Sequence, residues 1–229
     1  MIDNIKPVFI EILKFLFFAM CIAFAVIVVI LITSMDIHAL GNIPENSLTE
    51  RTQEALLAIS ILLFAYRMKQ AKAQGLWLVV GFLGCMLIRE WDAVFDQLFH
   101  GAWKFFAIPL ALLCTYLALK NGIQKACQDL QDYFGTTSYK LLFAGLLVVL
   151  VVSRVLGMRL LVHVISGPYF HQSIKSFLEE GTELLGYMII FSSSLCYCLV
   201  PEFSFLQALL KPEENTKLDR KNSALKTDA

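Results

Sequence analysis

Charged residues are scarce in this chain of 229 residues: Asp, Glu, Lys and Arg make up only 17% of it, whereas hydrophobic residues make up 58%. Together with a mean hydropathy of +0.67, this scarcity excludes an ordinary soluble globular domain. Neither sign of charge is in excess, because 19 basic residues balance 19 acidic ones. The charge balance therefore predicts no nucleic acid as a partner. Membrane lipid is the expected surrounding, and a membrane-protein partner is left open.

Several sequence signatures of chemistry are also missing. The chain has no Gly-rich phosphate loop, no nucleophile elbow, no His-Glu-x-x-His motif and no internal repeat. Its 6 cysteines lie mostly inside apolar runs, which is typical of small buried residues and not of a disulfide framework. No convincing small-residue cleavage site follows Ser34, so the first apolar run predicts a retained span and not a signal peptide.

What the sequence does contain is a succession of apolar stretches. A helix needs about twenty predominantly apolar residues to cross a bilayer, and the chain predicts an all-α, polytopic transmembrane bundle of about six spans that forms one membrane domain over residues 1–205. The predicted spans cover residues 7–34, 47–67, 75–96, 102–119, 141–162 and 176–200, and Pro201 ends the last of them. Residues 206–229 are polar and rich in lysine, which predicts a disordered cytoplasmic tail.

Lysine and arginine in the short loops predict the orientation of these spans, because cytoplasmic loops carry an excess of both. The loops after the second and fourth spans, and the tail, contain most of the cations: Arg67, Lys69, Lys72, Lys120, Lys125, Lys140, Lys211, Lys217, Arg220, Lys221 and Lys226. Both termini are therefore predicted on the cytoplasmic side of the cell membrane, which is the inner membrane if the cell is Gram-negative.

One connecting segment has a pattern of its own. Between the fourth and fifth spans, apolar residues recur at helical spacing opposite a polar side that includes Gln124, Lys125, Asp129 and Asp132. The apolar residues are Ile123, Cys127, Leu130 and Phe134. The pattern predicts a short helix that lies on the inner membrane surface.

Charged residues that the span limits force into the membrane gather, in this topology, in the outer half of the bundle. A charge buried alone costs at least a few kcal/mol, so residues on different helices are expected to face one another. Within each helix they are spaced three or four apart, which makes one stripe per helix. The sets are Glu50 and Glu54; Arg89, Asp92 and Asp96; Glu179 and Glu183; and Arg154 as the deep cation of the fifth span.

These residues predict an acid-rich polar site. The carboxylates outnumber the arginines, so bound protons, a divalent cation or a cationic ligand must neutralise the remainder. The candidate catalytic residues are Glu54, Asp92, Glu183 and Arg154. The candidate metal ligands are Glu54, Asp92, Asp96, Glu180, Glu183, His163 and His171. Two members have a structural reading instead, because Ser47-x-x-Glu50 and Ser176-x-x-Glu179 both fit a capping box.

Three classes of function fit such a site. The first is a metal-assisted membrane enzyme that acts on a lipid or lipid-linked substrate, with a carboxylate as base and Arg154 on a phosphate or oxyanion. The second is an ion- or proton-coupled transporter, for which intramembrane acids are characteristic. The third is a noncatalytic subunit or assembly factor in which the charges lock the helices together. The sequence favours the first over the others by a small margin.

The predicted topology can be tested by thiol labelling of intact cells. A cysteine placed at Asn42 or Ser173 should react with a membrane-impermeant maleimide, whereas one placed at Gln74 or Ser223 should not, because the first two lie in predicted outer loops. The opposite labelling pattern would invert the orientation of every span.

Overall fold

The computed structural model describes residues 5–41, 43–44, 47–97, 99–158 and 172–210. Helices and short turns make up this part of the chain, with no strand in it. The longer helices are α1 (Ile5–Leu40), α2 (Leu48–Ala71), α3 (Trp77–Glu90), α5 (Trp103–Leu119), α6 (Ile123–Phe134), α7 (Thr137–Leu147) and α10 (Gln172–Leu210). Shorter elements are η2 (Gln74–Leu76), α4 (Asp92–Phe95), the π-helical turn η3 (Val148–Val152) and α8 (Ser153–Leu156).

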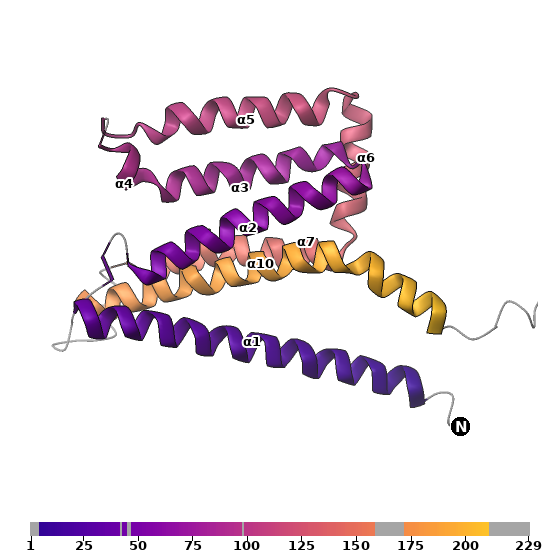
Figure 1. Ribbon diagram of the computed structural model, residues 1–229, viewed down its shortest axis with the longest axis horizontal. Coiled ribbons are helices and arrows are strands. Elements are labelled where there is room, and N and C mark those ends of the chain that lie inside the picture. Colours follow the sequence, from indigo (N-terminus) through magenta and orange to yellow (C-terminus); the bar gives the residue numbers. More distant parts are fainter. Residues whose placement is uncertain (1–4, 42, 45–46, 98, 159–171, 211–229) are drawn as a thin grey trace, which may run out of the picture.

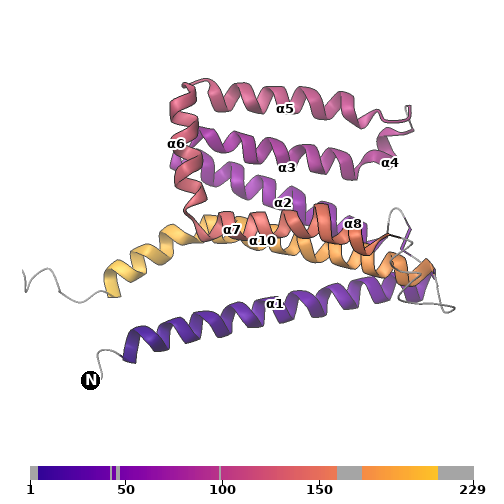
Figure 2. The same cartoon turned by 180° about the vertical axis from the view of Figure 1, so that it is seen from behind.

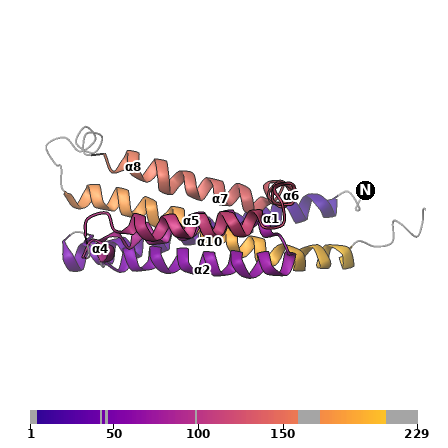
Figure 3. The same ribbon diagram turned by 90° about the horizontal axis from the view of Figure 1, so that it is seen from above.

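The helices lie side by side, as Figure 1 shows, in the order α5, α3, α2, α10 and α1. The view from behind in Figure 2 places α7 and α8 along α10, and α6 runs across the ends of α5, α3 and α2. The bundle thus has an α4 end, where α1 ends and α2 and α10 begin, and an α6 end, where α2 ends and α7 begins. From above, Figure 3 shows that α6 is the one longer helix seen end-on.

Among the residues that the structure describes, three helical stretches are long and apolar enough to cross a bilayer: Ile22–Leu40, Thr137–Leu156 and Gln172–Leu199, with mean hydropathies of 2.3, 2.1 and 1.3. A fourth span results if α5 and α6, which meet at 98°, are taken as one broken span. The chain is therefore an all-helical protein with several helices suited to a membrane, and six spans are not confirmed. The helix α3 has 14 residues, so it is about 21 Å long and shorter than the hydrocarbon core.

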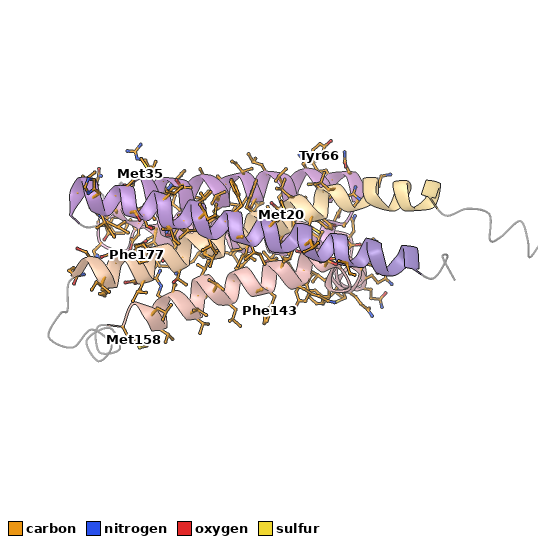
Figure 4. All side chains as sticks on the ribbon, turned by 90° about the horizontal axis from the view of Figure 1, so that it is seen from below. Met20, Met35, Tyr66, Phe143, Met158 and Phe177 are labelled. Carbon is orange, nitrogen blue, oxygen red and sulfur yellow. The ribbon has the colours of Figure 1, made fainter. Side chains whose placement is uncertain are left out.

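Large apolar side chains cover the outside of the bundle, as expected where the surrounding is lipid. Figure 4 shows Met20, Met35, Phe143 and Met158 directed away from the ribbons, and all four are more than half exposed. The interior is apolar as well, with Leu57, Phe64, Leu83, Tyr187 and Ile190 at its centre. An apolar surface over an apolar core is the arrangement of a helical membrane protein and not that of a soluble bundle.

The predicted third span is not one helix. It breaks at Trp91, whose backbone (ψ 19°) leaves the helical region between α3 and α4. The single stripe predicted for Arg89, Asp92 and Asp96 is therefore wrong, since a stripe requires continuous helical turns. The predicted end of the sixth span at Pro201 is also not seen, because α10 continues through Pro201 to Leu210. Residues 211–229 of the predicted tail lie outside the described residues.

The two predicted capping boxes have different outcomes. Ser47 caps α2, because its side chain accepts a hydrogen bond from the backbone N–H of Glu50 at 3.2 Å. The same helix start receives Asp36 of α1, which accepts hydrogen bonds from Thr49 through N–H at 2.7 Å and through Oγ1 at 2.6 Å. Ser176 is not a cap, since α10 already begins at Gln172. Glu179 is consequently free for another role.

Glycines allow a close helix contact in the core. At the crossing of α7 and α10, a Cβ atom on Gly145 would lie 2.7 Å from Cγ1 of Ile190 and 3.0 Å from the backbone oxygen of Gly186. Such distances are too short for an alanine, so the two helices approach more closely than side chains would allow. Small residues at helix crossings are a general device of membrane bundles.

Replacing Gly145 by Ala should therefore separate α7 from α10 and lower the free energy of unfolding by about 1 to 3 kcal/mol, the range typical of overpacking. The measurement is thermal or denaturant unfolding in detergent. Gly135→Ala is the matched control, because its Cβ atom would meet its nearest neighbour at an ordinary 3.5 Å. Equal unfolding of the two variants would contradict the close crossing.

Candidate functional site

The candidate site begins with one stripe of α10. Lys175, Glu179, Glu183 and Tyr187 follow one another at intervals of four residues, so they lie on the same side of the helix. The stripe runs inward from the α4 end of the bundle. Glu183 and Tyr187 are buried, whereas Lys175 and Glu179 are partly exposed.

Two arginines from other helices bind the carboxylates of this stripe. Arg154 of α8 donates to Glu179 Oε1 through Nη1 at 3.0 Å and to Glu183 Oε1 and Oε2 through Nη2 at 2.9 and 3.2 Å. Arg89, near the end of α3, donates through Nη2 to Glu183 Oε1 at 3.5 Å and to Glu90 Oε1 at 2.8 Å. Glu183 thus lies between two guanidinium groups.

Two further residues bind the outer carboxylates of this set, Glu179 and Glu90. Lys175 Nζ lies 2.6 Å from Glu179 Oε2, and the hydroxyl of Tyr187 donates to Glu90 Oε1 at 2.7 Å. We call the resulting set the charge network. It consists of Lys175, Glu179, Arg154, Glu183, Arg89, Glu90 and Tyr187, so three cations alternate with three carboxylates.

Glu183 is the most buried charged residue of the charge network. The side chain of Arg154 is 45% exposed and that of Arg89 33%, but that of Glu183 is only 3% exposed. A buried carboxylate requires compensating charge, because its desolvation is costly in a medium of low dielectric. The two arginines supply it while keeping part of their own surface accessible, as arginine does at the edges of membrane bundles.

Local structure explains why these groups meet. The π-helical turn Val148–Val152 stands directly before Ser153 and Arg154, and a turn of this kind changes the direction in which the following residues point. Gly157 then leaves room for a partner: a Cβ atom there would come within 2.5 Å of the carboxyl carbon of Glu179. Because α3 ends at Glu90, Arg89 lies in its last turn, beside Glu183 of α10.

The other predicted site residues are placed differently. Glu180 is half-buried and receives a hydrogen bond from Gln53 Nε2 to its Oε2 at 3.3 Å. Within the described part of the chain, the side chain of Glu54 forms no hydrogen bond or ion pair. His163 and His171 lie outside the described residues, so the structure says nothing about them.

Asp92 and Asp96 belong to α4 and its end, apart from the charge network. Asp96 accepts a hydrogen bond from the backbone N–H of Gly101 at 2.7 Å and lies 2.9 Å from Nδ1 of His100. The Gly101 bond, followed by the His100 contact, lowers the pKa of Asp96 below its usual value. Asp92 Oδ1 is buried without a hydrogen-bond partner in the described structure.

The geometry changes the electrostatic interpretation of the site. Across residues 5–41, 43–44, 47–97, 99–158 and 172–210, no group of three or more His, Cys, Asp and Glu side chains is arranged to hold a metal ion. The carboxylates of the charge network are instead matched by cations one to one. The excess of acid inferred from the sequence therefore does not apply to Glu179, Glu183 and Glu90.

The sequence analysis missed three participants of the site, Lys175, Tyr187 and Gln53, and it gave Arg89 the wrong neighbours. Spacing could have revealed two of them, because Lys175 and Tyr187 extend the Glu179–Glu183 stripe by one turn in each direction. Arg89 was assigned to a stripe with Asp92, which the break at Trp91 rules out. No sequence pattern identified Gln53 as a partner of Glu180, because a single glutamine is common in helices.

The fold and the charge network define the class of protein as an all-helical one with membrane-compatible helices and a buried ionic cluster. Comparison with known proteins goes no further: no family model matches the chain, and neither a curated protein nor a solved structure is significantly similar to it.

Glu183→Gln should lower the free energy of unfolding by about 2 kcal/mol, because it removes charged hydrogen bonds to Arg154 and Arg89 while each arginine retains another carboxylate. If the site instead held the excess of acid that the sequence predicts, the same amide would relieve repulsion between carboxylates and raise stability. Glu54→Gln is the control and should change stability by less than about 0.5 kcal/mol. Unfolding in detergent compares the two, and equal stability would argue against a compensated Glu183.

Proposed function

We propose that this chain is a noncatalytic multi-pass membrane protein, a subunit or assembly factor, in which the charge network locks α3, α8 and α10 together. The observation that supports this function most is the alternation of the network: each of the carboxylates Glu179, Glu183 and Glu90 has a cation within 3.0 Å. Paired charges that fix the mutual position of helices are a known means of specifying one arrangement of a bundle.

The proposal keeps the orientation inferred from the loops. Both termini then lie in the cytoplasm, and the charge network lies in the outer half of the membrane. Lipid covers the apolar outer surface, and the protein acts through contacts with a membrane-protein partner. A metal-assisted enzyme acting on a lipid has less support, because Glu183 and Arg154 bind each other (2.9 Å) and Asp92 and Asp96 belong to α4.

A second candidate function, proton-coupled transport, is favoured by one observation. The groups from Glu183 through Arg89 and Glu90 to Tyr187 are connected by successive hydrogen bonds, and Tyr187 is fully buried. Chains of ionisable groups inside a membrane are characteristic of proton relays. In a structural lock, the charge of Glu183 only holds the helices in position. In a proton relay, the same charge is also needed for transport.

A double-mutant cycle separates the two candidates, using Arg154→Met, Glu183→Leu and their combination. The design suits this network, since removing Arg154 and Glu183 together leaves the pairs Arg89–Glu90 and Lys175–Glu179 intact. If the network is a lock, each single variant is destabilised and the double variant recovers, with a coupling of about 1 to 3 kcal/mol. Apolar pairs often replace buried ion pairs without loss of stability.

The same proteins, reconstituted in liposomes with an entrapped pH-sensitive dye, give the functional readout. Under a potassium diffusion potential, wild type and double variant should both show the slow acidification of protein-free liposomes. Proton flux with the wild type that is lost in a stable double variant would overturn the lock and establish the relay. Independent stabilities of the two single variants would overturn the lock on structural grounds.

A further inference from the structure

The helix α6 differs from the rest of the bundle in direction. It meets α5 at 98°, and Figures 1 and 2 show it crossing the ends of α3 and α2. If α5 runs across a bilayer, α6 runs along the bilayer surface. A helix in that position has three surroundings at once: protein on one side, lipid on the second and water on the third.

The residues of α6 divide into three sides accordingly. Ala126, Asp129 and Tyr133 are buried against the protein. A quarter-turn away, Ile123 is 67% and Phe134 48% exposed, and Cys127 is exposed beside them. The remaining side carries Gln124, Gln128, Gln131 and Asp132, all exposed. The sequence placed Asp129 on the polar side, which is wrong, because Asp129 faces the protein.

Asp129 fixes the rotation of α6 about its own axis. Its Oδ2 accepts a hydrogen bond from the backbone N–H of Gly75 at 3.0 Å, and its Oδ1 lies 2.7 Å from Lys125 Nζ. The contact is close, since a Cβ atom on Gly75 would lie 2.5 Å from the backbone oxygen of Ala126. The exposed apolar residues Ile123, Cys127 and Phe134 are therefore held away from the protein, whereas Leu130 beside them is partly buried against the core.

The charge around α6 suits one kind of surface. Exposed cations surround the α6 end of the bundle, namely Lys69, Lys72, Lys120, Lys125 and Lys140. Of the two acids in α6, Asp129 is buried and paired, which leaves Asp132 exposed. A cluster of lysines beside an amphipathic helix is complementary to anionic lipid headgroups.

We propose that α6 lies in the lipid–water interface, with Ile123, Cys127 and Phe134 among the upper acyl chains and with Lys120 and Lys140 on anionic headgroups. The bilayer is thus the occupant of the exposed apolar side of α6. This inference rests on the membrane setting alone and holds whether the charge network is a lock or a relay.

Spin labels on α6 test the placement in nanodiscs of phosphatidylcholine mixed with phosphatidylglycerol. The positions are the native Cys127, Ile123→Cys and Phe134→Cys on the apolar side, and Gln124→Cys, Gln128→Cys and Gln131→Cys on the polar side, in a background without the other cysteines. Labels on the apolar side should collide with dissolved oxygen and not with a water-soluble nickel chelate. Labels on the polar side should show the opposite preference.

Two results would overturn the interfacial position. Oxygen access at all six positions would mean that α6 is immersed in the bilayer, and protection of the apolar side from both reagents would mean that a protein covers it. If the cysteine-free background unfolds, hydroxyl-radical footprinting of the unmutated protein replaces the labels: Ile123 and Phe134 should be protected in nanodiscs, and modification at both residues would overturn the proposal.

A separate experiment tests the role of Lys120 and Lys140. Phosphatidylglycerol should draw the label at Cys127 deeper than pure phosphatidylcholine does, and Lys120→Gln with Lys140→Gln should abolish this difference. Lys104→Gln is the matched control, since Lys104 is exposed at the start of α5, away from α6. A lipid dependence that survives the double substitution would overturn the assignment of these lysines to headgroups.

Discussion

The position of Glu183 between Arg154 and Arg89 is the constraint on which the α4 end of the bundle depends. A carboxylate that is 3% exposed in an apolar bundle is costly unless opposite charge reaches it. That charge comes from two separate segments, α3 and α8. The ends of both segments must therefore lie beside Glu183 of α10. The local features that allow this are the break after Glu90, the π-helical turn before Arg154 and the absence of a side chain at Gly157, where the carboxyl group of Glu179 lies.

The all-helical class could be predicted from composition and periodicity, because long apolar stretches leave no other way to satisfy backbone hydrogen bonds in lipid. The number of spans could not. A hydropathy pattern treats residues 75–96 as one continuous stretch, whereas the backbone leaves the helix at Trp91, a residue that carries no breaking signal of its own. The α5–α6 bend has a clearer signal in Gly122, whose φ of 97° favours glycine.

The candidate site was partly accessible from sequence for a similar reason. Spacing of four residues within α10 is a local property, so Glu179 and Glu183 could be placed on one side of a helix. Which residue of another helix lies opposite is a tertiary property, set by where that helix ends. Glu54 and Glu183 look alike in sequence, yet one has no side-chain partner among the described residues and the other has two.

The unequal lengths of the helices have a mechanical consequence for the surrounding lipid. The α3 and α5 pair, with 14 and 17 residues, is about 21 to 26 Å long, whereas hydrocarbon cores are about 30 Å thick. On the opposite edge, α1 has 36 residues and exceeds that thickness. If α3 and α5 each cross a bilayer, that bilayer must thin beside them and not beside α1, so the two edges then differ in hydrophobic mismatch. Such asymmetric deformation attracts neighbours of matching thickness to one side of the molecule, and it gives the bundle a preferred direction in the plane of the membrane.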